Sequence, residues 1–215
     1  MNENIIQTKY DVTKKSKIRE FYDLYKIYIF LFIAATIISI ASYIAISEIK
    51  NNKKIDLSNK YISAKIFLDN RENEKAKKIL SKIIYENDST YSTLSLFLLI
   101  EENLINNQKE ISNLFDYLLI NCKFEEELKN LVIFKKAMHQ SSYVNENNLL
   151  KTLKPLISKE NFWKPHALLL IGNYYLEKNE KNKAREFFQT IMLLKNLNND
   201  FYQKARNQLI LIENE

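Results

Sequence analysis

The sequence predicts an all-α protein in which a single membrane-spanning helix near the N-terminus precedes a domain of helical repeats. Three observations predict this fold class: an uncharged apolar stretch early in the chain, apolar residues that recur every three or four positions after it, and a scarcity of helix breakers. The 215 residues include one Gly and two Pro. Phosphate-binding loops and tight hairpin turns depend on glycine, so neither is expected. The length suits one anchor and one domain with its own core.

The membrane-spanning helix is predicted at residues 27–46, where twenty consecutive residues carry no charge. At about 1.5 Å per residue, this stretch spans the roughly 30 Å hydrocarbon core of a bilayer. Tyr28 and Tyr43 lie near its ends, where interfacial aromatic residues are favoured. A buried core helix is the alternative, but the stretch is apolar on every face. A cleavable signal peptide usually has a shorter apolar region, so we expect a permanent anchor.

The basic residues on either side of this helix predict its orientation. Six precede it and four follow it closely, and basic residues favour the cytoplasmic side of a membrane. In a bacterium, this places the N-terminus in the cytoplasm and the large domain in the periplasm, held to the inner membrane by a single pass. The predicted regions are a basic cytoplasmic tail at residues 1–26, the transmembrane helix at 27–46, a juxtamembrane linker at 47–55 and the repeat domain at 56–215.

The repeats are clearest near the C-terminus. Gly172, Tyr175, Ala184 and Phe188 stand at positions 8, 11, 20 and 24 of a unit of about 34 residues, which is the tetratricopeptide spacing. Small residues at positions 8 and 20 let the two helices of a pair approach closely. The same register continues toward the N-terminus and gives four helix pairs: position 8 is Ala64, Leu99 and Ala137, position 20 is Ala76, Ile111 and Leu149, position 24 is Leu80, Phe115 and Leu153, and position 27 is Ile83, Leu118, Leu156 and Ile191.

The middle two pairs depart from this pattern, because Glu102 and Gln140 replace the aromatic residue at position 11. Residues 200–212 follow the fourth pair as a solitary capping helix, which a repeat array needs at its end. The prediction is therefore a tetratricopeptide-like α-α superhelix of about four helix pairs plus a C-terminal capping helix. An ordinary helical bundle has the same periodic Leu and Ile and stays open as the alternative.

The predicted binding surface is the concave face of the superhelix, which the first helix of every tetratricopeptide pair lines. Much of this face would be apolar, and that suits an extended or helical segment of another protein. Packing inside the domain is the alternative for some of its residues. The candidate protein-binding residues are Tyr61, Lys65, Leu68, Leu96, Ile100, Phe134, Met138, His166, Leu169, Asn173 and Leu176.

Residues for catalysis or for metal and cofactor binding are scarce. His139 and His166 are the only histidines and fit no metal-ligand spacing, so surface or capping roles are predicted. Cys122 is followed by acidic residues, which do not favour a thiolate. Lysines alternate with glutamates instead of forming a basic stripe, which argues against nucleic-acid binding. We predict a protein that is not an enzyme and binds no cofactor, and we expect Phe162 and Trp163 to pack between helices.

The order of basic tail, single span, degenerate helix pairs and closing helix resembles the YfgM-like family of ancillary SecYEG translocon subunits. The most specific stretch begins at Phe162, where FWKPHALLLIGNYYLEKNEKNKAREFFQTIM is followed after a short linker by FYQKARNQLILI. The resemblance implies a periplasmic-facing adaptor that associates with translocon components or periplasmic chaperones. A self-associating structural protein, involved in envelope organisation or division, is the second functional hypothesis, and a homo-oligomer is compatible with both.

Overall fold

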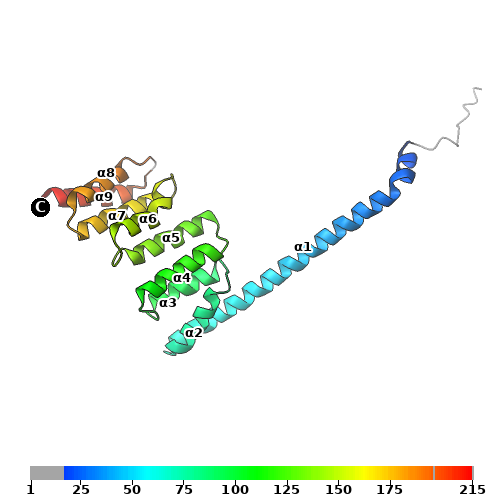
Figure 1. Cartoon of the computed structure of the whole chain (residues 1–215), viewed down its shortest axis with the longest axis horizontal. Helices are drawn as coiled ribbons and strands as arrows, with labels where there is room; N and C mark the ends of the chain where they lie inside the picture. Colours follow the sequence, from blue (N-terminus) through cyan, green and yellow to red (C-terminus); the bar gives the residue numbers. More distant parts are fainter. Residues whose placement is uncertain (1–16, 196, 215) are drawn as a thin grey trace, which may run out of the picture. The chain divides into compact units, whose positions relative to one another are not determined.

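The computed structural model describes residues 17–195 and 197–214. In this part of the chain there are nine α-helices and no strand (Figure 1), so the predicted all-α fold class is confirmed. The chain divides into two compact units, residues 1–55 and 56–215. Residues 1–16 of the predicted cytoplasmic tail lie outside the described residues.

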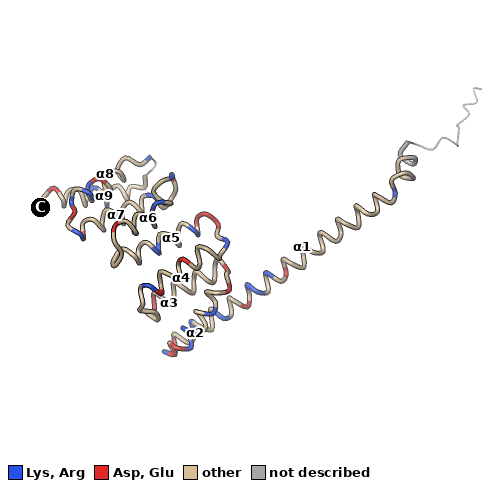
Figure 2. The backbone as a smooth tube through the Cα atoms, in the orientation of Figure 1, with Lys and Arg blue, Asp and Glu red and all other residues tan. Residues whose placement is uncertain are grey.

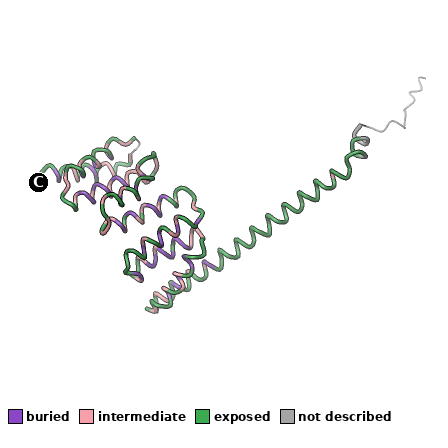
Figure 3. Tube along the Cα trace, in the orientation of Figure 1, coloured by how far each residue is buried: buried purple, intermediate pink, exposed green. Residues whose placement is uncertain are grey.

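The first unit consists of most of helix α1, which runs without a break over Lys17–Asp69. Its apolar window is long enough to cross a membrane and has none of its residues buried. Figure 2 shows the uncharged run along α1, and Figure 3 shows it exposed. The core helix of a water-soluble protein would be buried, so this long apolar helix is compatible with a single-pass anchor. Residues 47–55, predicted as a linker, continue the helix.

Two hydroxyl groups inside the apolar stretch are satisfied by the helix backbone. Thr36 Oγ1 donates to the carbonyl oxygen of Ile33 at 2.7 Å, and Ser39 Oγ donates to that of Ala35 at 2.8 Å. Hydroxyl groups that bond back to the preceding turn need no water. The side chains of Thr36 and Ser39 are therefore compatible with a hydrocarbon environment.

The second unit contains the end of α1 and eight further helices. Each helix from α2 onward packs against the next one along the chain, and α5 also contacts α7, as α7 contacts α9. Asn87, Asn103 and Asn179 follow helices in the left-handed conformation, which Asn tolerates better than most residues. The helices are α2 Asn73–Ile84, α3 Tyr91–Glu101, α4 Gln108–Asn121, α5 Glu126–Gln140, α6 Glu146–Ile157, α7 Lys164–Glu177, α8 Lys181–Met192 and α9 Asn199–Asn214.

The repeat register predicts the core of this unit correctly. All sixteen residues at positions 8, 20, 24 and 27 of the four predicted pairs are buried. They belong to the end of α1 with α2, to α3 with α4, to α5 with α6, and to α7 with α8. At position 24 even large side chains are fully buried: Leu80, Phe115, Leu153 and Phe188 are at most 1% exposed.

Gly172 lets α8 pack directly against α7. A Cβ atom at this position would lie 2.4 Å from Cε1 of Phe188 and 2.7 Å from its Cζ, distances that two carbon atoms do not tolerate. The buried ring of Phe188 therefore packs directly on the α7 backbone. This is the close approach that a small residue at position 8 predicts.

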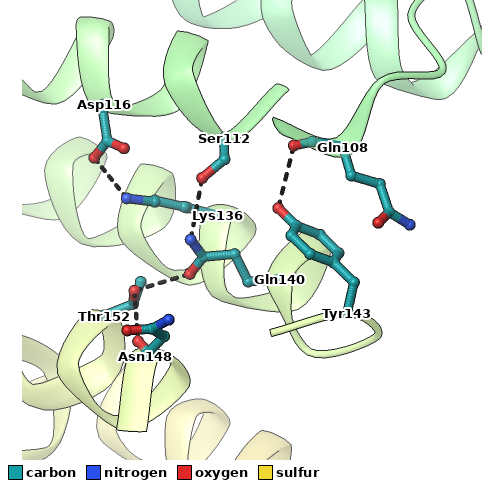
Figure 4. A network of polar contacts seen from close by, with 8 residues as sticks. All are labelled: Gln108, Ser112, Asp116, Lys136, Gln140, Tyr143, Asn148 and Thr152. Atoms are coloured by element: carbon teal, nitrogen blue, oxygen red, sulfur yellow. Dashed lines mark hydrogen bonds and ion pairs between the residues drawn. The ribbon is translucent and has the colours of Figure 1, made fainter. Parts of the chain in front are cut away.

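At position 11 the third pair, α5 with α6, has Gln140, which belongs to a polar network (Figure 4). The fourth pair, α7 with α8, has the aromatic Tyr175 there. Gln140 is 7% exposed at the end of α5. Its Nε2 donates to Ser112 Oγ on α4 at 3.2 Å, and its Oε1 accepts from Thr152 Oγ1 on α6 at 2.8 Å. Nearby, Lys136 forms an ion pair of 2.5 Å with Asp116. One buried amide thus links three helices, with a hydrogen bond to its nitrogen and another to its oxygen.

Candidate functional site

A cleft of about 780 Å³ lies between α5, α7 and α9. Five of the eleven predicted binding residues line it, and all five come from α5 or α7. Its remaining wall comes from the turn before α7, from the connection between α8 and α9, and from α9 itself. The five predicted residues are Phe134, Met138, His166, Leu169 and Asn173, and the apolar residues that join them are Phe162, Pro165, Leu170, Leu194, Leu197 and Phe201.

His166 is the centre of an aromatic cluster in this cleft. Its ring centroid lies 4.5 Å from that of Phe201, 5.1 Å from those of Phe162 and Trp163, and 5.7 Å from that of Phe134. Phe134 lies on α5, Phe162 and Trp163 lie directly before α7, and Phe201 lies on α9. Edge and tilted contacts at such distances are favourable, so the cluster fixes the inner surface of the cleft.

The surroundings of His166 favour its neutral form. Burial lowers the pKa of His166 below its ordinary value of 6.5, and the positive charge of Lys204 lowers it further. Nδ1 lies 3.3 Å from the carbonyl oxygen of Phe162, which opposes this shift. Since a carbonyl oxygen can only accept, Nδ1 carries the proton and Nε2 keeps a lone pair. His166 therefore offers one hydrogen-bond acceptor inside a mostly apolar cleft.

Phe162 and Trp163 do not share one role, although both were expected to pack between helices. Trp163 packs beside Phe134, with ring centroids 5.5 Å apart, and its Nε1 donates to Glu127 Oε2 at the start of α5 at 3.1 Å. Phe162 is 66% exposed at the mouth of the cleft. The expectation holds for Trp163 and is wrong for Phe162, whose ring is free to contact a ligand.

Ion pairs neutralise most of the charge at the rim. Glu160 pairs with Lys164, and Asp200 pairs with Lys204 at 2.7 Å. Lys204 Nζ also lies 5.7 Å from the centre of the Phe201 ring. Lys195 lines the cleft, and no described carboxylate pairs with it. The rim therefore carries one uncompensated positive charge.

A second cleft, of about 520 Å³, lies between α3, α4 and α5. Met138 lines both clefts, so they meet at α5. The second cleft contains Ile100, another predicted binding residue, with Phe97 and Phe115 as its aromatic walls. Lys135 lies at its edge. Together the two clefts offer an apolar surface that extends over several helices of the second unit.

The other five predicted residues lie outside both clefts. Leu96 is fully buried, so its assignment to a binding surface is wrong and it belongs to the core. Tyr61 and Leu68 are half-buried against the same group of core residues as Leu96. Leu176 is half-buried against the core residues of the C-terminal helices. Lys65 is exposed on α1. The register locates the first helices correctly but does not say which of their side chains face solvent.

The clefts also contain residues that the sequence analysis missed. The sequence places Leu197 in a connection and Phe201 in the capping helix, outside the predicted binding surface. In the structure α9 contacts α7, as α7 contacts α5. The repeat register gives no signal for Phe201, because aligning the buried Ala205 with Gly172 puts Tyr202, and not Phe201, at a concave-face position.

Cys122 lies in surroundings that do not activate a thiol. Cys122 is buried at the end of α4, and burial, followed by the charge of Asp88, raises the pKa of its thiol. A protonated, buried thiol is a poor nucleophile. Among the described residues, no group of three or more His, Cys, Asp or Glu side chains could hold a metal ion.

No protein-family model, no curated protein and no solved structure matches this chain. The resemblance to the YfgM-like family therefore rests only on the residues that suggested it. Function has to be argued from the apolar helix and from the clefts.

Proposed function

We propose that this protein is a membrane-anchored adaptor whose tetratricopeptide-like domain binds an apolar segment of another protein. One observation carries the proposal: five predicted concave-face residues, from two helices that are not adjacent in sequence, line a single cleft. An ordinary bundle would bury these residues in its core instead. Aromatic side chains in a cleft with a polar rim are typical of protein-binding sites.

The two clefts favour an extended occupant. They meet at Met138, so a segment that fills both would cross α5 and contact α3 and α7. Lys195 stands at the edge of the first cleft without a described ion-pair partner, so a carboxylate at that end of the segment would be favoured. The second cleft is lined by both Lys135 and Glu101 and favours neither sign of charge. The proposed ligand is therefore an apolar segment with an acidic residue at one end.

The apolar part of α1 supports the anchor. We propose a single pass through the bacterial inner membrane with the N-terminus in the cytoplasm and the repeat domain in the periplasm, as the basic residues around the span predict. Translocon components and periplasmic chaperones are the proposed partners. Alkaline extraction of membranes tests the anchor: the full-length chain is expected in the pellet, and its release would contradict a spanning helix.

Photocrosslinking in cells tests the cleft. Photoreactive residues at Phe162 and Met138 are expected to capture the partner, which mass spectrometry identifies. The control is Ile120, an apolar residue on α4 that is 80% exposed and lines neither cleft. Equal capture from Ile120 would contradict a specific site. Adducts with this chain alone would favour the self-associating structural protein.

A pair of matched variants measures the contribution of the cleft. Phe162→Ser removes an exposed ring from its mouth and is expected to weaken partner capture about tenfold, as central aromatic contacts commonly do. Ile120→Ser removes a similarly exposed apolar side chain elsewhere and should leave capture unchanged. Quantitative copurification from detergent-solubilised membranes gives the ratio, and equal losses in both variants would overturn the site.

A further inference from the structure

The end of α1 has two apolar faces, of which the repeat domain covers one. Leu57 and Ala64 are at most 1% exposed and pack into the domain. Ile62 and Ile66 are 51% and 53% exposed. At about 100° per residue, both lie within about 20° of the direction opposite Ala64. The outer face of the first helix in a repeat array is normally polar, so these two isoleucines need an explanation.

The outer face has the spacing of a coiled-coil seam. Asn59, Ile62 and Ile66 follow one another at intervals of three and four, and Asn59 precedes Ile66 by one heptad. Ile55, also exposed, stands one heptad before Ile62. In coiled-coil terms, Ile55 and Ile62 occupy d positions and Asn59 and Ile66 occupy a positions. A single Asn at an a position is a known determinant of parallel two-stranded pairing.

We propose that a second copy of this chain covers this face, through a parallel pairing of the two α1 helices at Asn59, Ile62 and Ile66. A heptad seam is complementary to itself in a parallel arrangement. Chains anchored in one membrane by the same helix already point in the same direction, and their confinement raises the effective concentration of the two seams. The inference rests on the proposed anchor but not on the binding cleft.

The residues beside the seam permit this pairing. In a parallel dimer, each g position lies opposite the e position of the next heptad on the partner helix. Here these pairs are Ser58 with Ser63 and Lys65 with Asn70, so neither places like charges opposite each other. The charged Asp56 and Lys60 of this segment form an ion pair of 2.6 Å within the helix. Asp69, at the d position after Ile66, would meet the same residue of the second copy, so the proposed seam ends at Ile66 and like charges face each other only beyond it.

Disulfide crosslinking of the full-length chain in its membrane tests the pairing. Ile62→Cys and Ile66→Cys place identical residues opposite each other at the seam, within reach of a disulfide. Lys60→Cys, on the same exposed stretch but outside the seam, is the control. Mild oxidation is expected to give about tenfold more dimer from the two seam variants, and the native chain, whose Cys122 is buried, should give none. Equal dimer from Lys60→Cys would overturn the parallel pair.

A charge-exchange experiment separates pairing from any effect on folding. Ile62→Glu and Ile62→Lys are each expected to abolish copurification of two differently tagged copies, because like charges meet at the seam. Coexpression of the Glu variant with the Lys variant should restore it, since opposite charges then face each other. Absence of rescue, or copurification that survives in both single variants, would overturn the proposal. Retention of the chain in the alkaline-extracted membrane pellet tests the anchor separately.

Discussion

The third helix pair, α5–α6, and the fourth, α7–α8, fill the same repeat positions with different chemistry. At position 8 the third pair has Ala137 and the fourth has Gly172, and at position 24 they have Leu153 and Phe188. All four residues are buried. The fourth pair combines the larger Phe188 with the smaller Gly172, where the third combines Leu153 with Ala137. The summed side-chain volume at positions 8 and 24 is therefore similar in the two pairs, as close packing requires.

Position 11 differs even more, and it connects each pair to its surroundings. In the fourth pair, the ring of Tyr175 stacks on Phe187 with centroids 5.5 Å apart, and its hydroxyl donates to Glu146 Oε1 at the start of α6 at 2.6 Å. In the third pair, Gln140 bonds instead to α4 and α6. The comparison teaches that these two pairs fill their four core positions alike with apolar residues, while their position 11 side chains form hydrogen bonds to different helices.

The largest effect is expected from Phe188→Ala in the fourth pair. Removing a fully buried ring costs both its transfer free energy and a cavity, about 4 kcal/mol in the free energy of unfolding, against about 3 kcal/mol for Leu153→Ala in the third pair. Urea unfolding of the full-length chain in detergent, followed by the fluorescence of Trp163, measures both. A smaller loss for Phe188→Ala than for Leu153→Ala would contradict the tighter packing of α7 on α8.

The effect of Gly172→Ala on stability depends on whether the ring of Phe188 is present. In the native chain the added Cβ would collide with Phe188, so we expect a loss of stability although Ala is the better helix former by about 1 kcal/mol. In the Phe188→Ala background the obstacle is gone, and the same change should stabilise. Two additive substitutions would contradict direct contact between these residues.

The next effect is the loss of the amide that links three helices in the third pair. Gln140→Leu keeps the approximate size of the side chain but removes the partner of Ser112, whereas Thr152 can still donate to the carbonyl oxygen of Asn148. We expect a loss of about 1 kcal/mol in the free energy of unfolding, because a hydroxyl group that loses a partner away from water retains its desolvation cost. The same urea measurement applies. An unchanged unfolding midpoint would mean that water replaces the amide.

A compensating variant distinguishes hydrogen bonding from packing at this site. The triple substitution Ser112→Ala, Gln140→Leu and Thr152→Val removes donors and acceptors together, so no group is left unsatisfied. Its stability is expected to return most of the way to that of the native chain. A further loss in the triple variant would instead assign the effect to packing of the side chains.

The sequence predicts the core better than the surface for a physical reason. Burial of Ala137, Leu149 and Leu153 follows from helical periodicity, which is a local property of the chain. The bond between Gln140 and Ser112 joins residues 28 apart, and no local pattern specifies such a pair. The cleft is harder still, because Phe201 reaches His166 only through the docking of α9 on α7. Tertiary packing therefore determines which first-helix residues are accessible.

The smallest expected effect is a pH dependence at the contact between Tyr175 of the fourth pair and Glu146 of the third. The hydrogen bond from Tyr175, and then the one from Lys183, lowers the pKa of Glu146 below its ordinary value of 4.5. A carboxyl group whose pKa is lower in the folded state stabilises the fold above the unfolded-state pKa, and this contribution is lost as the pH falls through the folded-state pKa. The urea midpoint of the native chain should therefore decrease on acidification below about 4.5, and Glu146→Gln should decrease less. Glu177→Gln leaves the contacts among Tyr175, Glu146 and Lys183 intact and should follow the native curve. If Glu146→Gln also follows the native curve, other carboxylates carry the acid sensitivity, and position 11 of the fourth pair then contributes through its ring alone.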